Sequence, residues 1–175
     1  MTRRASPPVM WVTTASGYKD AMGPHQFSLT PTLGRGLLAG LAGTVAMTAF
    51  QRLVEMPLTG RGDSYSPADF AQEVLPIRPP VGQRRRWLNE VAHLSLGGMW
   101  GAAYGVAATA GLRGQKAVNV VFAAVYTGDV VLNTALGLYE PTNWTAQNWV
   151  VDVVDKYVQA LATGLIFNHL LDPAR

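Results

Sequence analysis

The amino-acid sequence predicts an all-helical integral membrane protein, a bundle of about four transmembrane helices. Of the 175 residues, 49% are hydrophobic and only 14% are charged, whereas soluble domains carry about 25% charged residues. Several apolar segments are close to the roughly 20 residues that a helix needs to cross about 30 Å of hydrocarbon. Five of the 18 glycines repeat at every fourth position in two of these segments, which is typical of closely packed membrane helices.

The chain is expected to divide into a flexible N-terminal tail, 1–32, and a four-helix transmembrane domain, 33–171. Proline lacks an amide hydrogen and clashes with the preceding helical turn, so Pro57 is expected to end the first span. A polar connector, 59–86, follows, and it contains one helical patch at 67–75. The spans are predicted at about 33–54, 88–110, 117–139 and 149–171, and charged residues make the last of them the weakest.

The order of spans gives the bundle two ends. The connector 59–86 and the loop 140–148 share one membrane face, side A, because the first and third spans end there and the other two begin there. The opposite face, side B, carries the short turn with Arg113 and Lys116. Basic residues in short loops favour the cytoplasmic side. Both termini are therefore expected in the cytoplasm.

Small residues form stripes along two of the predicted spans. Residues four apart lie on one helix face, so such stripes let two backbones approach closely. The pattern predicts packing inside the monomer, with a homo-oligomer or docking onto a membrane-complex partner as the alternative. The glycines expected to pack helices in this way are Gly36, Gly40, Gly97, Gly101 and Gly105.

Ionisable residues within the spans gather in the half of the bilayer next to side A. Charges in hydrocarbon cost about 2.5–3.5 kcal/mol each near its centre, so these side chains should face one another or a wet cavity. Asp152 and Lys156, four residues apart, should pair, and Asp129, the deepest carboxylate, needs Lys156 or His93 as a partner or stays protonated. The polar cluster consists of Asp129, His93, Glu55, Asp155, Lys156, Asp152 and Asn133.

Two interpretations of this polar cluster remain open. It is either a structural ion-pair network or a polar vestibule that binds protons or passes a small solute. A histidine and a desolvated carboxylate both respond to mild acidification, which favours a response to acid or protons. A structural or accessory subunit of a membrane complex is the second hypothesis. A small channel or transporter that acts as an oligomer is the third.

Other classes of function find no support in the sequence. Ser64 and Ser66 have no neighbouring His and Asp arrangement, so a hydrolase is not expected and the protein is predicted to be non-enzymatic. The scattered histidines predict no metal site, and no phosphate-binding glycine loop indicates a cofactor. The basic residues flank apolar segments, so the partner that we expect is the lipid bilayer and not nucleic acid.

Short motifs along residues 33–170 carry a distant resemblance to a known family. They are Gly36–Gly40, Val54–Leu58, Gly60-Arg61, His93 before Tyr104-Gly105, and Ala135–Leu138 before a loop with Pro and Trp. In this order they resemble the YagU-like inner-membrane proteins of bacteria. The resemblance implies a bacterial inner-membrane protein, an association with acid resistance and no established biochemical activity. It singles out Glu55 and His93 as positions of interest.

Overall fold

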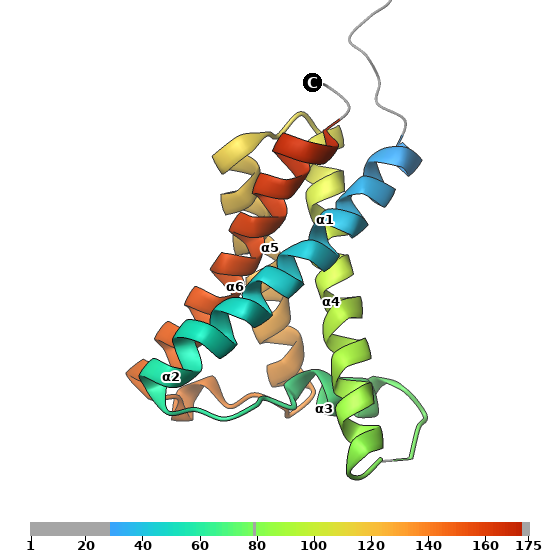
Figure 1. Ribbon diagram of the computed structural model, residues 1–175. Helices are drawn as coiled ribbons and strands as arrows, with labels where there is room; N and C mark the ends of the chain where they lie inside the picture. The colour runs from blue at the N-terminus through green and yellow to red at the C-terminus, as the bar shows by residue number, and fades with distance from the viewer. Residues whose placement is uncertain (1–28, 79, 173–175) are drawn as a thin grey trace, which may run out of the picture.

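The computed structural model describes residues 29–78 and 80–172, and within these ranges every regular element is helical. The all-α class is therefore confirmed. Four long helical segments form a bundle, and two short helices lie in its loops (Figure 1). The elements are α1 (Leu29–Phe50), η1 (Gln51–Glu55), α2 (Met56–Thr59), α3 (Ser66–Val74), α4 (Gln83–Thr109), α5 (Gly114–Ala135), η2 (Pro141–Asn143), α6 (Ala146–Ile166) and η3 (Phe167–Leu171).

Two helical segments of the described chain are long and apolar enough to cross a membrane. Leu29–Thr59 has 31 residues and a mean hydropathy of 1.4, and Gly114–Ala135 has 22 residues and a mean hydropathy of 1.3. The segments α4 and α6 do not meet the same criterion. Both are long enough, but α4 begins with Arg84–Arg86 and α6 carries Asp152, Asp155 and Lys156.

The elements are arranged around two opposite ends of the bundle (Figure 1). The connector with α3 and the loop with η2 lie at one end, for which we keep the name side A. The turn between α4 and α5 lies at the other end, side B, together with the start of α1 and the end of α6. The helix α1 crosses α4 near side B and diverges from it toward side A.

Pro57 does not end the first helix, contrary to the sequence prediction. The helix changes to a π-helical turn over Gln51–Glu55 and continues as α2 to Thr59. A wider turn relieves the clash that proline makes with the preceding turn of a regular α-helix. The helix stops one turn later at Gly60, whose φ of 70° is the left-handed conformation that commonly closes helices.

Other predicted boundaries shift by a few residues. Residues 29–32, assigned to the tail, belong to α1, and the rest of the tail lies outside the described residues. The helix α4 begins at Gln83, five residues before the predicted span, directly after Gly82 with its φ of 56°. The helix α5 ends at Ala135, and α6 begins at Ala146, where the Thr145 hydroxyl accepts a hydrogen bond from the Asn148 amide. The helical patch of the connector is confirmed as α3.

The glycines of the first two spans pack α1 directly against α4. A Cβ atom added to Gly101 would lie 2.6 Å from the backbone nitrogen of Gly40, and one added to Gly105 would lie 3.0 Å from the carbonyl oxygen of Thr32. Gly36 faces the Gly101 backbone, and Gly97 faces the Thr44 side chain. All five glycines predicted to pack helices therefore lie at a contact within one chain.

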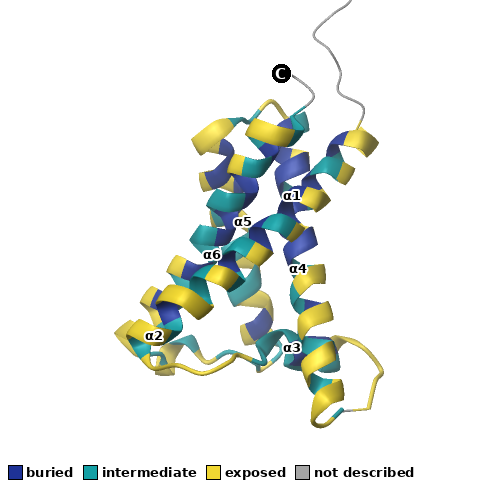
Figure 2. Cartoon of the chain, viewed as in Figure 1, coloured by how far each residue is buried: buried dark blue, intermediate teal, exposed yellow. Residues whose placement is uncertain are grey.

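The hydrophobic core occupies the half of the bundle near side B. Tyr104 and Phe167 are fully buried there, with ring centroids 5.2 Å apart. Arg113 closes this end through an ion pair of 2.8 Å between its Nε and Asp172 Oδ2. Buried residues lie on the helix faces that turn inward, whereas exposed residues cover the outer faces and the connector (Figure 2). The half near side A contains a cavity instead.

Candidate functional site

A cavity of about 620 Å³, the polar chamber, lies between the helices at the side-A end of the bundle. Its walls come from α1 and η1, the connector, α4, α5, the loop with η2, and α6. Six carboxylates and four basic side chains line it, which gives a formal charge of −2 with histidine neutral. They are Glu55, Asp63, Glu90, Asp129, Asp152 and Asp155, and Arg52, Arg61, Arg86 and Lys156.

Every member of the predicted polar cluster lines this chamber. The deepest part of the lining is formed by Gly97, Trp100 and Gln159. There the Gln159 amide donates a hydrogen bond of 3.0 Å to the Thr44 hydroxyl, which itself donates to the Gly40 carbonyl. Beyond this floor lie the glycine crossing and the aromatic core. Within the described chain, the chamber thus reaches from side A to about mid-bundle and no further.

Lys156 on α6 joins two helices by ion pairs. Its Nζ lies 2.6 Å from Asp129 Oδ2 on α5 and 2.8 Å from Asp152 Oδ1 one turn earlier on its own helix. The Asn133 amide donates to the other oxygen of Asp129 at 3.0 Å. The partner of Asp129 is therefore Lys156 and not His93. Paired charges of this kind satisfy one another in a low-dielectric interior.

Glu55 comes from the π-helical turn and is buried. Its Oε1 accepts a hydrogen bond of 2.8 Å from the Thr59 hydroxyl, and the Arg61 guanidinium lies 3.9 Å from the same oxygen. Arg61 belongs to the connector and is exposed. The left-handed turn at Gly60 places this arginine beside the glutamate that precedes it by six residues.

Asp155 is a buried carboxylate of the chamber that has no ion pair within the described chain. Asp155 is only 7% exposed. Its Oδ2 accepts a hydrogen bond of 2.7 Å from the Gln51 side-chain amide on η1. Its other oxygen, Oδ1, is buried and accepts no hydrogen bond from any described residue. A neutral amide is thus the only hydrogen-bond donor to this carboxylate in the described chain, and burial of a charge with so little compensation is costly.

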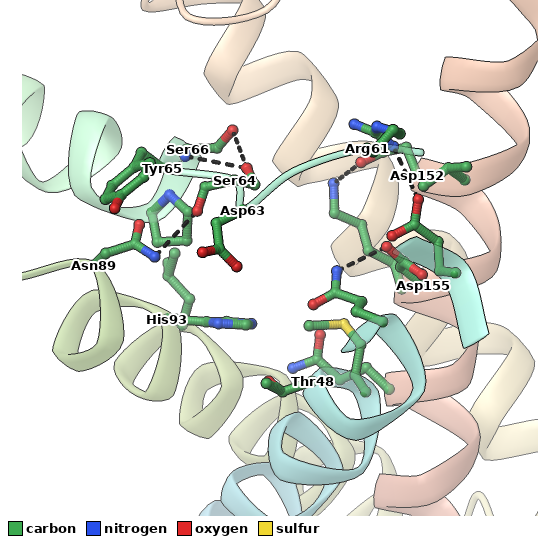
Figure 3. Close-up of a pocket in the computed structure, with 18 of the residues that line it drawn as sticks. Thr48, Arg61, Asp63, Ser64, Tyr65, Ser66, Asn89, His93, Asp152 and Asp155 are labelled. Atoms are coloured by element: carbon green, nitrogen blue, oxygen red, sulfur yellow. Dashed lines mark hydrogen bonds and ion pairs between the residues drawn. The ribbon is translucent and has the colours of Figure 1, made fainter. Parts of the chain in front are cut away.

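His93 and Asp63 face Asp155 from the opposite wall. Figure 3 shows both on the side formed by α4 and the connector, and it shows Arg61, Asp152 and Asp155 across the cavity. Within the described chain, neither His93 nor Asp63 has a hydrogen bond or ion pair, so both are available to the interior of the chamber. Near His93, Arg52 and Glu90 approach to 3.7 Å and are both more than half exposed.

The connector is held against α4 by side chains that the sequence analysis did not single out. Asn89 accepts a hydrogen bond from the Ala68 amide at 3.2 Å and donates one to the Ser64 carbonyl at 3.1 Å. One turn earlier, Arg85 pairs with Asp69 at 2.7 Å. These contacts keep the connector in place as one wall of the chamber.

Sequence reasoning placed the charged residues of the site but missed its neutral members. Gln51 and Gln159 lie in apolar helices, and each hydrogen-bonds a side chain on another helix. An amide inside an apolar span is a recognisable signal, because a buried polar group needs a partner. Arg61 and Asp63 were assigned to the connector without a role, since nothing in the sequence shows that this segment folds over the bundle.

The chamber is lined by more carboxylates than basic side chains. Ion pairs engage Asp129, Asp152 and Glu55. One oxygen each of Asp152 and Asp155 is buried without a donor in the described chain, and only Asp155 of these two has no ion pair. In the described residues, no group of three His, Asp or Glu side chains is placed to hold a metal ion. The arrangement is suited to taking up a proton or another positively charged donor.

A comparison of this chain with protein-family models, with curated proteins and with solved structures finds no match. The resemblance to the YagU-like family therefore stays a prediction. The function has to be argued from the geometry of the chamber.

Proposed function

We propose that this chain is a multi-pass membrane protein that responds to acid by taking up protons in its polar chamber. In this proposal α1, α4, α5 and α6 all cross the bilayer, and the chamber fills the half next to side A. The resemblance to bacterial inner-membrane proteins suggests the bacterial plasma membrane as the location. The turn with Arg113 and Lys116 suggests that side B faces the cytoplasm.

The outer surface of the bundle supports a location in the bilayer. Large apolar side chains point outward on each of the four long helices, and each is about 60% exposed: Leu38, Val45, Met99, Val131 and Val150. A soluble protein rarely exposes apolar surface all around its helices. Lipid would cover these side chains on α4 and α6 as well as on the two more apolar segments.

The interior of the bundle contains polar side chains and close glycine contacts, whereas its outer surface is apolar. Its buried polar residues include Thr44, Asn133, Asp155 and Gln159, and its closest helix contact is made of glycines. Small residues at helix contacts and polar side chains turned inward are characteristic of membrane bundles. Such a distribution allows α4 and α6 to cross a bilayer in spite of their charges.

The observation that carries the proposal is the Asp155 carboxylate. It is buried, its Oδ1 has no donor, and it lines a chamber with a formal charge of −2. A proton supplies both the missing donor and one positive charge. His93 faces the same space, and a histidine gains charge between about pH 5 and pH 8.

The alternative hypotheses receive less support from the geometry. A channel needs a continuous path, but the chamber ends at Gln159 and Trp100, and an aromatic core follows. Docking onto another subunit through glycine stripes needs exposed glycines. The five glycines in question are covered, because α1 and α4 pack against each other there.

Proton uptake can be measured by infrared difference spectroscopy on the full chain in detergent. On acidification from about pH 8 to about pH 5, the wild type should gain a carboxylic-acid band that is missing in Asp155→Asn. Glu73→Gln is the matched control, because Glu73 is exposed on α3 and does not line the chamber. A wild-type spectrum without such a band, or an identical band in Asp155→Asn, would contradict proton uptake at Asp155.

The acid response itself is tested in bacterial cells that depend on this protein. Asp155→Asn and His93→Gln should lower survival at acid pH, with protein levels equal to those of the wild type and of Glu73→Gln. Unchanged survival of both chamber variants at equal protein levels would remove acid response from the proposal.

A further inference from the structure

The wall of the chamber around Asp155 has fewer positive charges than negative ones. Four carboxylates lie there with two basic side chains: Glu55, Asp129, Asp152 and Asp155 with Arg61 and Lys156. Lys156 is held by Asp129 and Asp152, and Arg61 is paired with Glu55. Asp155 has only the neutral Gln51 amide, and its Oδ1 remains without a donor in the described chain.

The chamber is also much larger than proton uptake requires. At about 620 Å³ it falls within the range of roughly 300–1,000 Å³ that is usual for small-molecule sites. Its lining includes the aromatic side chains of Trp100, Tyr139 and Trp144, alongside the carboxylates. Carboxylates together with aromatic faces are the groups that attract an organic cation.

We propose that the polar chamber binds a small organic cation with a primary ammonium group, and that Asp155 is its counter-ion. This inference rests on the proposed function, because it assigns a second ligand to the carboxylate that takes up the proton. An ammonium group brings three N–H donors and one positive charge, which are the two things that Asp155 lacks. An anion would meet the excess of negative charge. A metal ion would need several ligands, and the described residues hold no such group.

Proton and ammonium compete in this proposal, since both occupy Asp155. The competition depends on the charged groups that face this carboxylate from every packed element. They are Glu55 on η1, Arg61 in the connector, Asp152 and Lys156 on α6, and Asp129 on α5, with Arg52, Arg86, Glu90, His93 and Asp63 elsewhere in the chamber lining. Acidification should therefore release the cation, and the cation should displace the proton.

The test is isothermal titration calorimetry with butylammonium chloride and the full chain in a detergent without amines. The wild type should bind butylammonium saturably at about pH 8, where the carboxylate is charged. Asp155→Asn should weaken binding about tenfold or more, the loss expected for one hydrogen bond between charged groups. Glu73→Gln should bind like the wild type, and sodium butyrate should not bind. No saturable binding, or equal affinities in the wild type and Asp155→Asn, would overturn the inference.

A measurement on the wild type alone covers the case that Asp155→Asn does not fold. Butylammonium should move the appearance of the infrared carboxylic-acid band to lower pH, and an unmoved band overturns the inference. If the band titrates without any amine binding, proton uptake stands and this inference fails. If the amine binds but no carboxylic-acid band appears at any pH, the ammonium site stands and proton uptake at Asp155 fails.

A primary ammonium also occurs in lipid headgroups, and the titration separates the two sources. In nanodiscs of phosphatidylcholine, butylammonium should bind as in detergent. If phosphatidylethanolamine nanodiscs abolish that binding, the headgroup amine occupies the chamber. If they leave it unchanged, the ligand is a soluble amine. Both results support the ammonium site, and failure in both nanodiscs contradicts it.

Discussion

At the scale of single residues, the chamber contains two carboxylates with very different surroundings. Asp129, which its depth in the sequence singles out, is compensated by Lys156 and by the Asn133 amide. Asp155, nine residues into α6 from its side-A end, has one neutral donor and one oxygen without any. The donors that reach each oxygen therefore single out Asp155, whereas position along the predicted spans singles out Asp129.

Lys156 gives a test of stability at this scale. Lys156→Met should destabilise the fold by about 3–5 kcal/mol, because removal of one member of a buried ion pair leaves uncompensated charge. Its side chain is 16% exposed and it serves both Asp129 and Asp152. Unfolding by denaturing detergent, followed by tryptophan fluorescence, measures the change.

The matched control is the same substitution in a chain that already carries Asp129→Asn and Asp152→Asn. With neutral partners, Lys156→Met should cost only a small part of its effect in the wild type. Equal costs in the two backgrounds would show that packing of the lysine side chain, and not its charge, holds α5 and α6 together.

At the scale of the elements, the contact between α1 and α4 depends on the absence of side chains. Gly40→Ala should destabilise the protein by about 1–3 kcal/mol, because the added methyl group overlaps the Gly101 backbone. The backbone nitrogen of Gly101 lies 2.6 Å from the position of that methyl group. The same detergent unfolding assay reports the change.

Gly128→Ala on α5 is the control for this glycine effect. A Cβ at Gly128 meets nothing within 4 Å, so alanine should stabilise the helix by about 0.5–1 kcal/mol or leave it unchanged. If Gly40→Ala is tolerated as well as Gly128→Ala, close backbone packing does not hold α1 against α4.

Helix type and order follow from the sequence, whereas the helix ends follow only in part. The apolar runs and glycine spacing predict the four long segments, and the charge pattern places the polar cluster at side A. The π-helical turn before Pro57 is not predictable in this way, because a proline pattern indicates a break and does not show how neighbouring turns absorb it. Gln51, which donates the hydrogen bond to Asp155, is the first residue of that turn.

The fold of the connector is the other part that the sequence does not reveal. Only its helical patch has a periodic pattern. Its position over the chamber depends on Asn89 and on the Arg85–Asp69 pair, which bridge residues 16 or more apart. Contacts between single polar side chains at such separations leave no repeating signal in the sequence.

At the scale of the whole molecule, the topology in the membrane can be tested directly. The chain has no cysteine, so single cysteines report accessibility without background. Ser64→Cys and Thr142→Cys should react with an impermeant maleimide from one side of the membrane and Lys116→Cys from the other. All three positions are exposed in the structure. Labelling of Ser64→Cys and Lys116→Cys from the same side would exclude the proposed crossing of α4.

The glycine crossing also has a mechanical consequence for the molecule. The two helices touch backbone to backbone around Gly40, and Glu55 lies 15 residues further along the same helical segment. At 1.5 Å per residue this distance is roughly 22 Å, so a pivot of about 5° at the crossing moves Glu55 by about 2 Å. Any tilt of the first helix at this crossing would therefore move the wall of the chamber that carries Glu55. A tilt of this size would widen or narrow the mouth of the chamber by less than the diameter of one water molecule.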